Sequence, residues 1–427
     1  MAVNASVQTR IEADFAMALT YCAFRNAGYV VDGMPEHQSE ETECTTKSFL
    51  WWTWKECETY FYPQGNISIE TPAGTTGLSG VQVKMCRWFR TEKVYTDGAG
   101  DYYCPRRWPS MLIGNNIDYT IVLNGRYLRQ RTNEYSTWNL CDALFGAACL
   151  CTHTYNIGFK NPKGYSCIIT NQAKKMWGRC ILNNAIYDYN LYADLANYTY
   201  PSKNLSVATS YEQQLGKESC PFLKNHINTS LIYGSSFWGT IATFIAYPLM
   251  YNLLPDLILK YSDDDMLIEE MSEGVWHELT HASMVERMKV TKGLFWASDY
   301  WSQIVYQQAY NSLKGFSAYG SSVNDANGQI IALTEGWAKF REWYMGMLYL
   351  NFNTLGGTND FMYYSSYINY NYAQMFKELY NIGCSMANLE ESLAAYSIAD
   401  FSTNLISLHS YKQTAIENII QNYLPTP

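Results

Sequence analysis

The segment His277–His281 constrains this chain more than any other, because its chemistry requires a helix. It reads His-Glu-Leu-Thr-His and places two imidazoles four residues apart. On an α-helix, residues at this spacing lie one above the other, separated by about 6 Å of rise. The two imidazoles can then bind one metal ion, and Glu278 can face a water bound to it. The segment therefore predicts a helix that carries a metal site and a general base.

Zn²⁺ is the cofactor that this motif favours. Zinc lowers the pKa of a bound water to about 7, and a neighbouring carboxylate can take its proton. The residues on either side of the motif are uncharged, as expected for a helix buried beneath a cleft, and the chain has only six histidines. The alternative is a pair of buried histidines that are satisfied by hydrogen bonds and bracket a glutamate by chance. We favour a zinc site with His277 and His281 as ligands and Glu278 as the base.

A third zinc ligand has to come from another segment, because catalytic zinc uses three protein ligands. The extended motif HExxHxxGxxH is excluded, since Met284 and Arg287 occupy its last two defined positions. Residues 331–344 have the apolar spacing of a second helix, and Glu335 lies off its apolar stripe between small residues. Small neighbours would let two helices approach closely enough to share a metal. The sequence therefore predicts Glu335 as the third ligand.

Three other residues are weighed beside Glu335. Glu342 fits better as a carboxylate on the solvated face of the same helix, while His409 is the reserve ligand. The sequence does not identify a group that would stabilise a developing oxyanion. Tyr319 and His409 are the candidates for that role.

These residues resemble the gluzincin branch of the zincin metallopeptidases. Gluzincins carry HExxH on one helix and a glutamate ligand on a later one. The likeness rests on His277, Glu278, His281 and the segment Glu335-Gly336-Trp337-Ala338, and it covers about residues 180 to 427. The step from His281 to Glu335 is nearer to neprilysin-like than to thermolysin-like enzymes. The pattern is most similar to uncharacterised secreted zinc peptidases of bacteria.

One position departs from that family. Many gluzincins have an aspartate four residues after the glutamate ligand, where it orients a zinc-binding histidine, but this chain has Lys339 there. A hydrogen-bond acceptor is still needed to set the tautomer of that histidine. It must come from a residue that the sequence does not identify.

Between Asn66 and about Asn124 the apolar residues alternate with a period of two, which predicts β-strands. Glycines and Asp-Gly pairs separate the runs and mark turns. The stretch from Gly80 to Trp88, together with residues 96–103, is similar to the carboxypeptidase regulatory-like, or transthyretin-like, β-sandwich. Residues 97–101 have a superficial likeness to a calcium loop, and a hairpin turn is their predicted role.

We expect an α+β protein, with an N-terminal β-sandwich-like domain followed by a mainly α-helical, zincin-like catalytic domain. After about residue 180 the apolar spacing becomes helical. The predicted divisions are an irregular or helical segment at residues 1–60, a transthyretin-like β-sandwich at 61–130, a cysteine-rich connection at 131–180 and a metallopeptidase domain at 181–427.

The twelve cysteines are many for a cytosolic enzyme and indicate an oxidising compartment with some disulfides. The cluster Cys141, Cys149, Cys151 and His153 has an uncommon spacing for zinc, so disulfides or buried thiols are its predicted state. The net charge of −9 and the absence of a Lys/Arg cluster argue against nucleic acid as a partner.

The expected location is outside the cytoplasm: secreted, periplasmic or at the cell surface. The first residues, Met1–Ser6, lack the basic and apolar regions of a signal peptide, so we expect a leader that has been removed. A lipid anchor on the native N-terminus is compatible with this. The uncharged segment Leu231–Leu254 holds many glycine, proline and polar residues, so we predict core helices there and no transmembrane segment.

The resulting hypothesis is a gluzincin-like zinc metallopeptidase. It would hydrolyse peptide bonds of extracellular or cell-surface proteins, glycoproteins included, with a zinc-activated water and Glu278 as general base. The alternative hypothesis is a non-catalytic zinc-binding or surface interaction protein that keeps a zincin fold. The intact Glu278 favours the enzyme, because an inactive relative would be expected to lose its base first.

Overall fold

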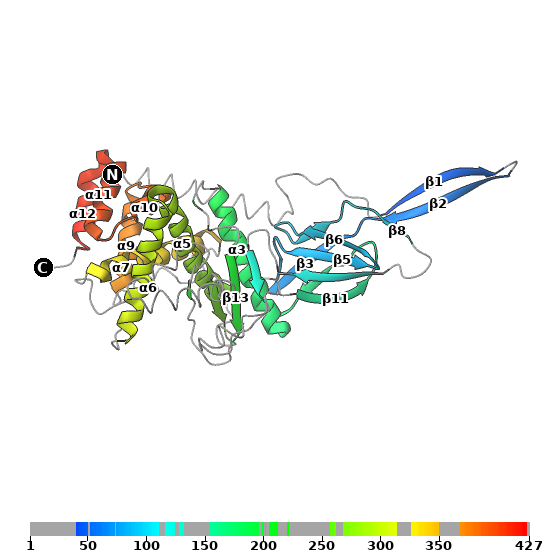
Figure 1. Cartoon of the computed structure of the whole chain (residues 1–427), viewed down its shortest axis with the longest axis horizontal. Coiled ribbons are helices and arrows are strands. Elements are labelled where there is room, and N and C mark those ends of the chain that lie inside the picture. Colours follow the sequence, from blue (N-terminus) through cyan, green and yellow to red (C-terminus); the bar gives the residue numbers. More distant parts are fainter. Residues whose placement is uncertain are drawn as a thin grey trace, which may run out of the picture. The chain divides into compact units, whose positions relative to one another are not determined.

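The chain forms two compact units in a computed structural model (Figure 1). The first comprises Thr20–Thr132 and Cys151–Tyr187 and is β-rich, and the second comprises Met1–Leu19, Asn133–Leu150 and Asp188–Pro427 and is mainly helical. The structure describes residues 40–49, 52–72, 74–110, 116–123, 128–131, 154–195, 199, 201, 205–211, 220–221, 257–261, 268–313, 326–349 and 368–424.

Four predictions from the sequence fall outside the described residues. They concern the N-terminal segment up to residue 39, the cluster from Cys141 to His153, the apolar segment Leu231–Leu254, and Tyr319. The described part shows β-sheets over residues 40–169 followed by a mainly helical region over 171–421. This order confirms the α+β prediction.

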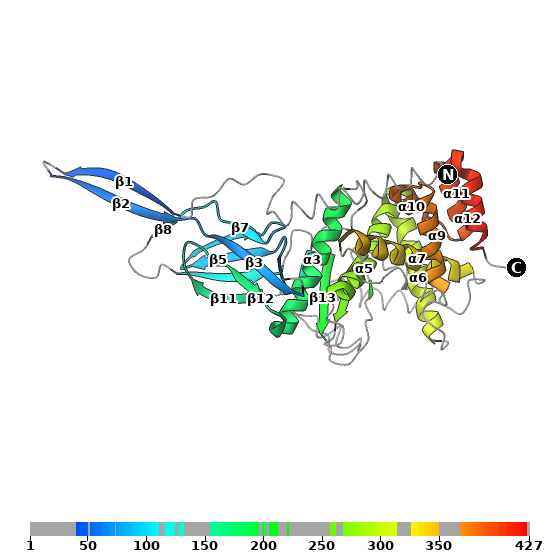
Figure 2. The same ribbon diagram turned by 180° about the vertical axis from the view of Figure 1, so that it is seen from behind.

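The β-rich unit is built from short sheets of antiparallel and parallel pairs (Figures 1 and 2). One sheet has the order β11-β9-β5-β6, a second has the order β12-β3-β4 with β7 also paired to β3, and a third has the order β1-β2-β8. The strands up to residue 169 are β1 (Glu40–Phe49), β2 (Trp52–Phe61), β3 (Gln64–Thr71), β4 (Gly74–Gly77), β5 (Gln82–Arg87), β6 (Arg90–Tyr95), β7 (Asp101–Tyr103), β8 (Trp108–Pro109), β9 (Ile117–Val122), β10 (Leu128–Arg131), β11 (Thr154–Lys160) and β12 (Cys167–Ile169).

The period of two in the sequence corresponds to the buried face of these sheets. Val83 pairs with Ile121 and Met85 with Tyr119 across β5 and β9, and none of the four side chains is exposed. Residues 97–101 lie at the turn between β6 and β7. The turn was predicted, but it does not close a hairpin, because β6 pairs with β5 and β7 pairs with β3. Within it, one carboxylate oxygen of Asp97 accepts hydrogen bonds from the backbone amides of Ala99 and Asp101, both at 2.9 Å.

Helix α3 (Lys174–Leu195) follows the short 3-10 turn η2 (Asn171–Ala173), and the division between the two units falls within it. In its first half, the amides of Asn183 and Asn184 bind backbone groups of Ser79 and Gly77 in the β-rich unit. In its second half, the hydroxyl of Tyr189 lies within hydrogen-bond distance of hydroxyls on helix α5 (Ile268–Lys292).

The helical unit continues with a small sheet and a set of packed helices. They are β13 (Leu205–Tyr211), β14 (Cys220–Pro221), β15 (Leu257–Tyr261), α5 (Ile268–Lys292), α6 (Leu294–Leu313), α7 (Ala326–Tyr349), α9 (Ile368–Asn381), α10 (Met386–Ser392), α11 (Ile398–Leu408), the 3-10 turn η3 (Ser410–Lys412) and α12 (Gln413–Gln421). No helix in the described ranges is long and apolar enough to cross a membrane.

The small sheet was not predicted. β13 runs parallel to β15, and β14 pairs with β15 in the antiparallel sense. Both β14 and β15 contact α5. A signal was present in the sequence, because Leu205, Val207 and Thr209 alternate and all three are buried.

Helix α7 lies between α5 and α9 and presents a different surface to each. The predicted apolar stripe is buried, and its members Trp337 and Phe340 pack against Phe376 of α9. Gly336 lets α9 approach, since a Cβ there would meet the Cβ of Tyr372 at 2.5 Å. The small residues beside Glu335 were predicted to allow close approach of the helix that shares the metal, but Gly336 allows close approach of α9 instead.

Replacing Gly336 with alanine should destabilise the protein by about 1–3 kcal/mol, the usual cost of an overpacked core. Part of this loss is offset, because alanine is the better helix former. Gly274→Ala is the matched control on α5, where a new Cβ would meet no atom within 4 Å. Urea unfolding of the two variants checks this, and a Gly336→Ala protein at least as stable as the parent would contradict the close contact.

Candidate metal centre

Helix α5 carries His277, Glu278 and His281 near its middle. The centroids of the two imidazole rings are 4.9 Å apart, and the rings are packed edge to face. The side chain of His281 is 2% exposed and that of His277 is 21% exposed, so solvent reaches the pair from the His277 side. The helix that the motif predicted is present, and it is buried as expected.

Helix α7 brings Glu335 to these histidines. One carboxylate oxygen of Glu335 lies 3.1 Å from Nε2 of His277 and 3.6 Å from Nε2 of His281. The ligand atoms of the three residues all lie within 4.8 Å of one another. Two imidazoles and one carboxylate are a donor set that catalytic zinc sites use. The structure therefore joins these three predicted residues in one candidate metal-binding group.

Glu342 does not lie on a solvated face, so the prediction from the sequence was wrong. Its side chain is 8% exposed, and Oε2 lies 3.2 Å from Nδ1 of His277. Glu342 follows Glu335 by seven residues, or about two helical turns, so both carboxylates reach the same side of α7. This spacing was a usable signal, but the sequence did not show that α5 covers that side.

Glu342 supplies the acceptor that the sequence left unidentified. When Nδ1–H of His277 donates to Glu342, the lone pair of Nε2 is left free for a metal ion. The other carboxylate oxygen of Glu342 binds the ammonium group of Lys339. The lysine at the position of the gluzincin aspartate therefore acts on Glu342 and not on a histidine.

Opposite charges lie close together in this buried group. Burial lowers the pKa of His277, but the hydrogen bonds that its ring donates to the carboxylates of Glu335 and Glu342 outweigh burial and raise the pKa to about 10. Burial alone would raise the pKa of Glu335, yet His281 and His277 hold that pKa well below its usual range. Glu342 also has a lowered pKa, because Lys339 and His277 outweigh its burial. The two buried carboxylates thus favour a positive charge at or beside His277, which either a proton or a metal ion can supply.

Glu278 and His281 each have a buried polar atom without a hydrogen-bond partner among the described residues. These atoms are Oε2 of Glu278 and Nδ1 of His281. Burial raises the pKa of Glu278, against the opposite effect of the two histidines. A buried oxygen without a partner costs free energy, and a water held by a metal ion would satisfy it. The donor set and the unpartnered carboxylate oxygen fit a metal ion with a bound water.

His409 is within hydrogen-bond distance of residues outside the candidate metal-binding group. Its Nε2 is 2.8 Å from the side-chain amide nitrogen of Asn388, and its Nδ1 is 3.4 Å from the hydroxyl of Tyr411. The reserve assignment of His409 as a metal ligand therefore has no support. Trp301 of α6 was not predicted as part of the site. The centroid of its ring lies 5.6 Å from the centroid of the His281 ring.

Comparisons with known proteins do not assign the chain to a family. It matches no protein-family model, and no curated protein or solved structure is significantly similar to it. Any assignment of function therefore depends on the geometry of the residues themselves.

Proposed function

We propose that this chain is a zinc-dependent peptidase of the gluzincin type. The observation that carries the proposal is the meeting of His277, His281 and Glu335 on two helices, with their ligand atoms within 4.8 Å of one another. Glu278 is buried beside them, with a carboxylate oxygen in need of a partner. This combination supplies three ligands and a base, as metal-assisted hydrolysis of an amide requires.

Each residue has a separate task in the proposed reaction. His277, His281 and Glu335 would hold the ion, and a bound Zn²⁺ would polarise the scissile carbonyl and acidify the attacking water. Glu278 would accept the proton of that water and deliver it to the leaving amine.

Metal analysis and digestion of a mixed peptide library test the proposal together. We expect about one zinc per chain, and cleavage that stops on chelation and returns with zinc. Zinc without cleavage would support the alternative of a non-catalytic zinc-binding or surface interaction protein. A purified, folded protein that binds no divalent metal would contradict both.

Replacing Glu342 with glutamine should weaken zinc affinity and kcat by about 10- to 100-fold each, the usual cost of losing the partner of a ligating histidine. The amide can still accept one hydrogen bond, so Glu342→Ala should be worse than Glu342→Gln. Zinc titration with a competing chelator measures the affinity. Equal zinc affinity in all three proteins would show that Glu342 does not orient His277.

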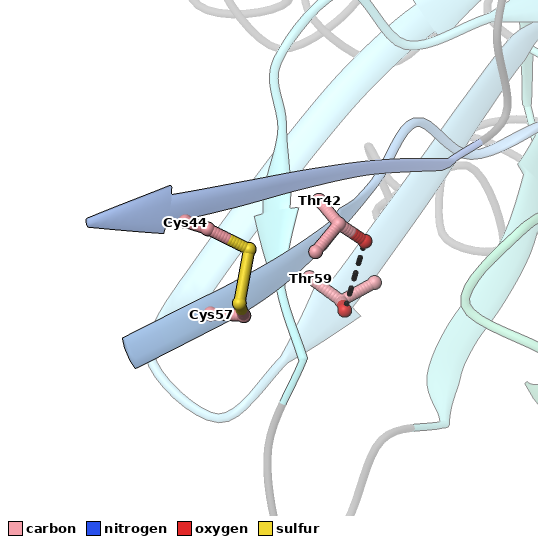
Figure 3. Close-up of a disulfide and its surroundings, with 4 residues drawn as sticks. All are labelled: Thr42, Cys44, Cys57 and Thr59. Atoms are coloured by element: carbon pink, nitrogen blue, oxygen red, sulfur yellow. Dashed lines mark hydrogen bonds between the residues drawn. A yellow bond between two sulfur atoms is a disulfide. The ribbon is translucent and has the colours of Figure 1, made fainter. Parts of the chain in front are cut away.

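We also propose a secreted, periplasmic or cell-surface location, with peptides or proteins as substrates and no nucleic-acid partner. The disulfide between Cys44 and Cys57 supports an oxidising compartment (Figure 3). The division into a transthyretin-like domain, a cysteine-rich connection and a metallopeptidase domain, the last starting near residue 181, is retained as a proposal.

A further inference from the structure

The ribbon formed by β1 and β2 extends beyond the other strands of the β-rich unit (Figures 1 and 2). Among the described residues, it is anchored at its base, where Tyr60 and Phe61 pair with β8 and Arg107 binds Glu43. From residue 42 to residue 48 every side chain of β1 is exposed. Both faces of the ribbon are therefore open to solvent.

A two-stranded ribbon of this kind is at best marginally stable alone in water. Here the Cys44–Cys57 disulfide links the strands midway along their length, and Thr42 and Thr59 approach each other next to it (Figure 3). The cross-link holds the ribbon in shape without a protein layer on either face. Among the described residues, the side chains near its far end are exposed and do not belong to a core.

The far end of the ribbon is aromatic. Trp52 is 71% exposed and Trp54 is 43% exposed, and the two side chains lie on the same face because they are two residues apart on one strand. Tryptophan has an apolar body and one polar N–H, and it favours the boundary between water and lipid.

Charge changes sign along the length of the ribbon, from lysines near its aromatic end to glutamates nearer its base. Lys47 lies opposite Trp54 and Lys55 lies opposite Thr46, two and three residues behind the pair of Phe49 and Trp52. At about 3.3 Å per residue, the lysines stand about 7–10 Å behind the aromatic end. Glu56 follows one step further back and pairs with Lys47, and Glu43 and Glu58 come after the disulfide.

We infer that this ribbon contacts the surface of a lipid bilayer with its aromatic end. Interfacial elements insert about 5–10 Å, which would place the lysines at the level of the lipid phosphates and leave the acidic residues in water. The order of aromatic, basic and acidic residues along the axis of the ribbon matches a planar boundary between lipid and water. The net charge of −9 disfavours acidic membranes, so zwitterionic phosphatidylcholine is the lipid we assign.

Co-sedimentation of the full chain with phosphatidylcholine vesicles tests this inference. We expect the double variant Trp52→Ser/Trp54→Ser to lose about tenfold or more in partitioning, since two large aromatic surfaces no longer leave water. The control is Trp88→Ser/Phe89→Ser in the turn between β5 and β6, where the side chains are 71% and 102% exposed. It removes more exposed aromatic surface from the same unit and should partition like the parent.

Failure of the parent protein to bind vesicles would overturn the inference, as would equal losses in the two double variants. Thiol labelling shows that the Cys44–Cys57 bond forms in each protein, so a misfolded ribbon is recognised. The inference does not depend on the proposed peptidase activity. Peptide cleavage in free solution should be the same in the parent and in the Trp52→Ser/Trp54→Ser variant.

Discussion

Glu335→Ala should leave a folded protein that no longer retains stoichiometric zinc and has no measurable peptidase activity. Glu335 is the one carboxylate in the candidate ligand group, and it contacts both histidines. Loss of a residue that hydrogen-bonds to a metal ligand lowers metal affinity by about 10- to 100-fold. Loss of the ligand itself should therefore lower zinc affinity by more than about 100-fold. Metal content after dialysis and circular dichroism measure the two halves of the prediction.

The control for this substitution is His409→Ala, which removes an imidazole that bonds to Asn388. It should keep its zinc, although its stability falls. The opposite pattern, with full zinc in Glu335→Ala and none in His409→Ala, would replace the proposed ligand set by three histidines. Glu342→Gln should lose an intermediate amount of zinc, more than His409→Ala and less than Glu335→Ala.

Glu278→Gln should keep its zinc while kcat falls by about 10²- to 10⁴-fold, the usual contribution of a positioned base. Glutamine has nearly the same shape as glutamate, so the fold and the ligand group are preserved. The amide cannot take a proton from water, which removes the step assigned to Glu278. Measured zinc content and steady-state kinetics on one cleaved peptide separate these effects.

Glu286→Gln is a matched control on the same helix. Glu286 lies five residues after His281, pairs with Lys289, and is absent from the ligand group. Its substitution should change kcat less than twofold or so, as for a surface ion pair. Unchanged turnover in Glu278→Gln would remove the general-base mechanism even if zinc is present.

The ligand group was predictable because its spacing is local. A spacing of four positions puts the two histidines on one face of a helix, and Glu335 lies off the apolar stripe of α7. The period of two likewise identified Val83, Met85 and their partners as a buried face. These inferences needed only the geometry of a single helix or strand.

The features that the sequence did not predict depend on which helices and strands pack against one another. Glu342 was assigned to solvent because nothing in its own helix shows that α5 covers it. The sheet of β13 and β15 joins segments about fifty residues apart in parallel, and such pairs have no hairpin turn to signal them. Gly336 was rightly expected at a close approach, but its partner α9 could be identified only from the packing.

Helix α3 affects the order in which this chain can fold while it is being synthesised. Asn183 and Asn184 bind groups that precede them by more than 100 residues, so the first half of the helix can join the β-rich unit once it leaves the ribosome. Tyr189 has to wait for Thr280, 91 residues later. At a synthesis rate of about 5–20 residues per second, that wait lasts about 5–20 seconds. During this interval one half of the helix is in place, while the other half presents its tyrosines to chaperones or to other nascent chains.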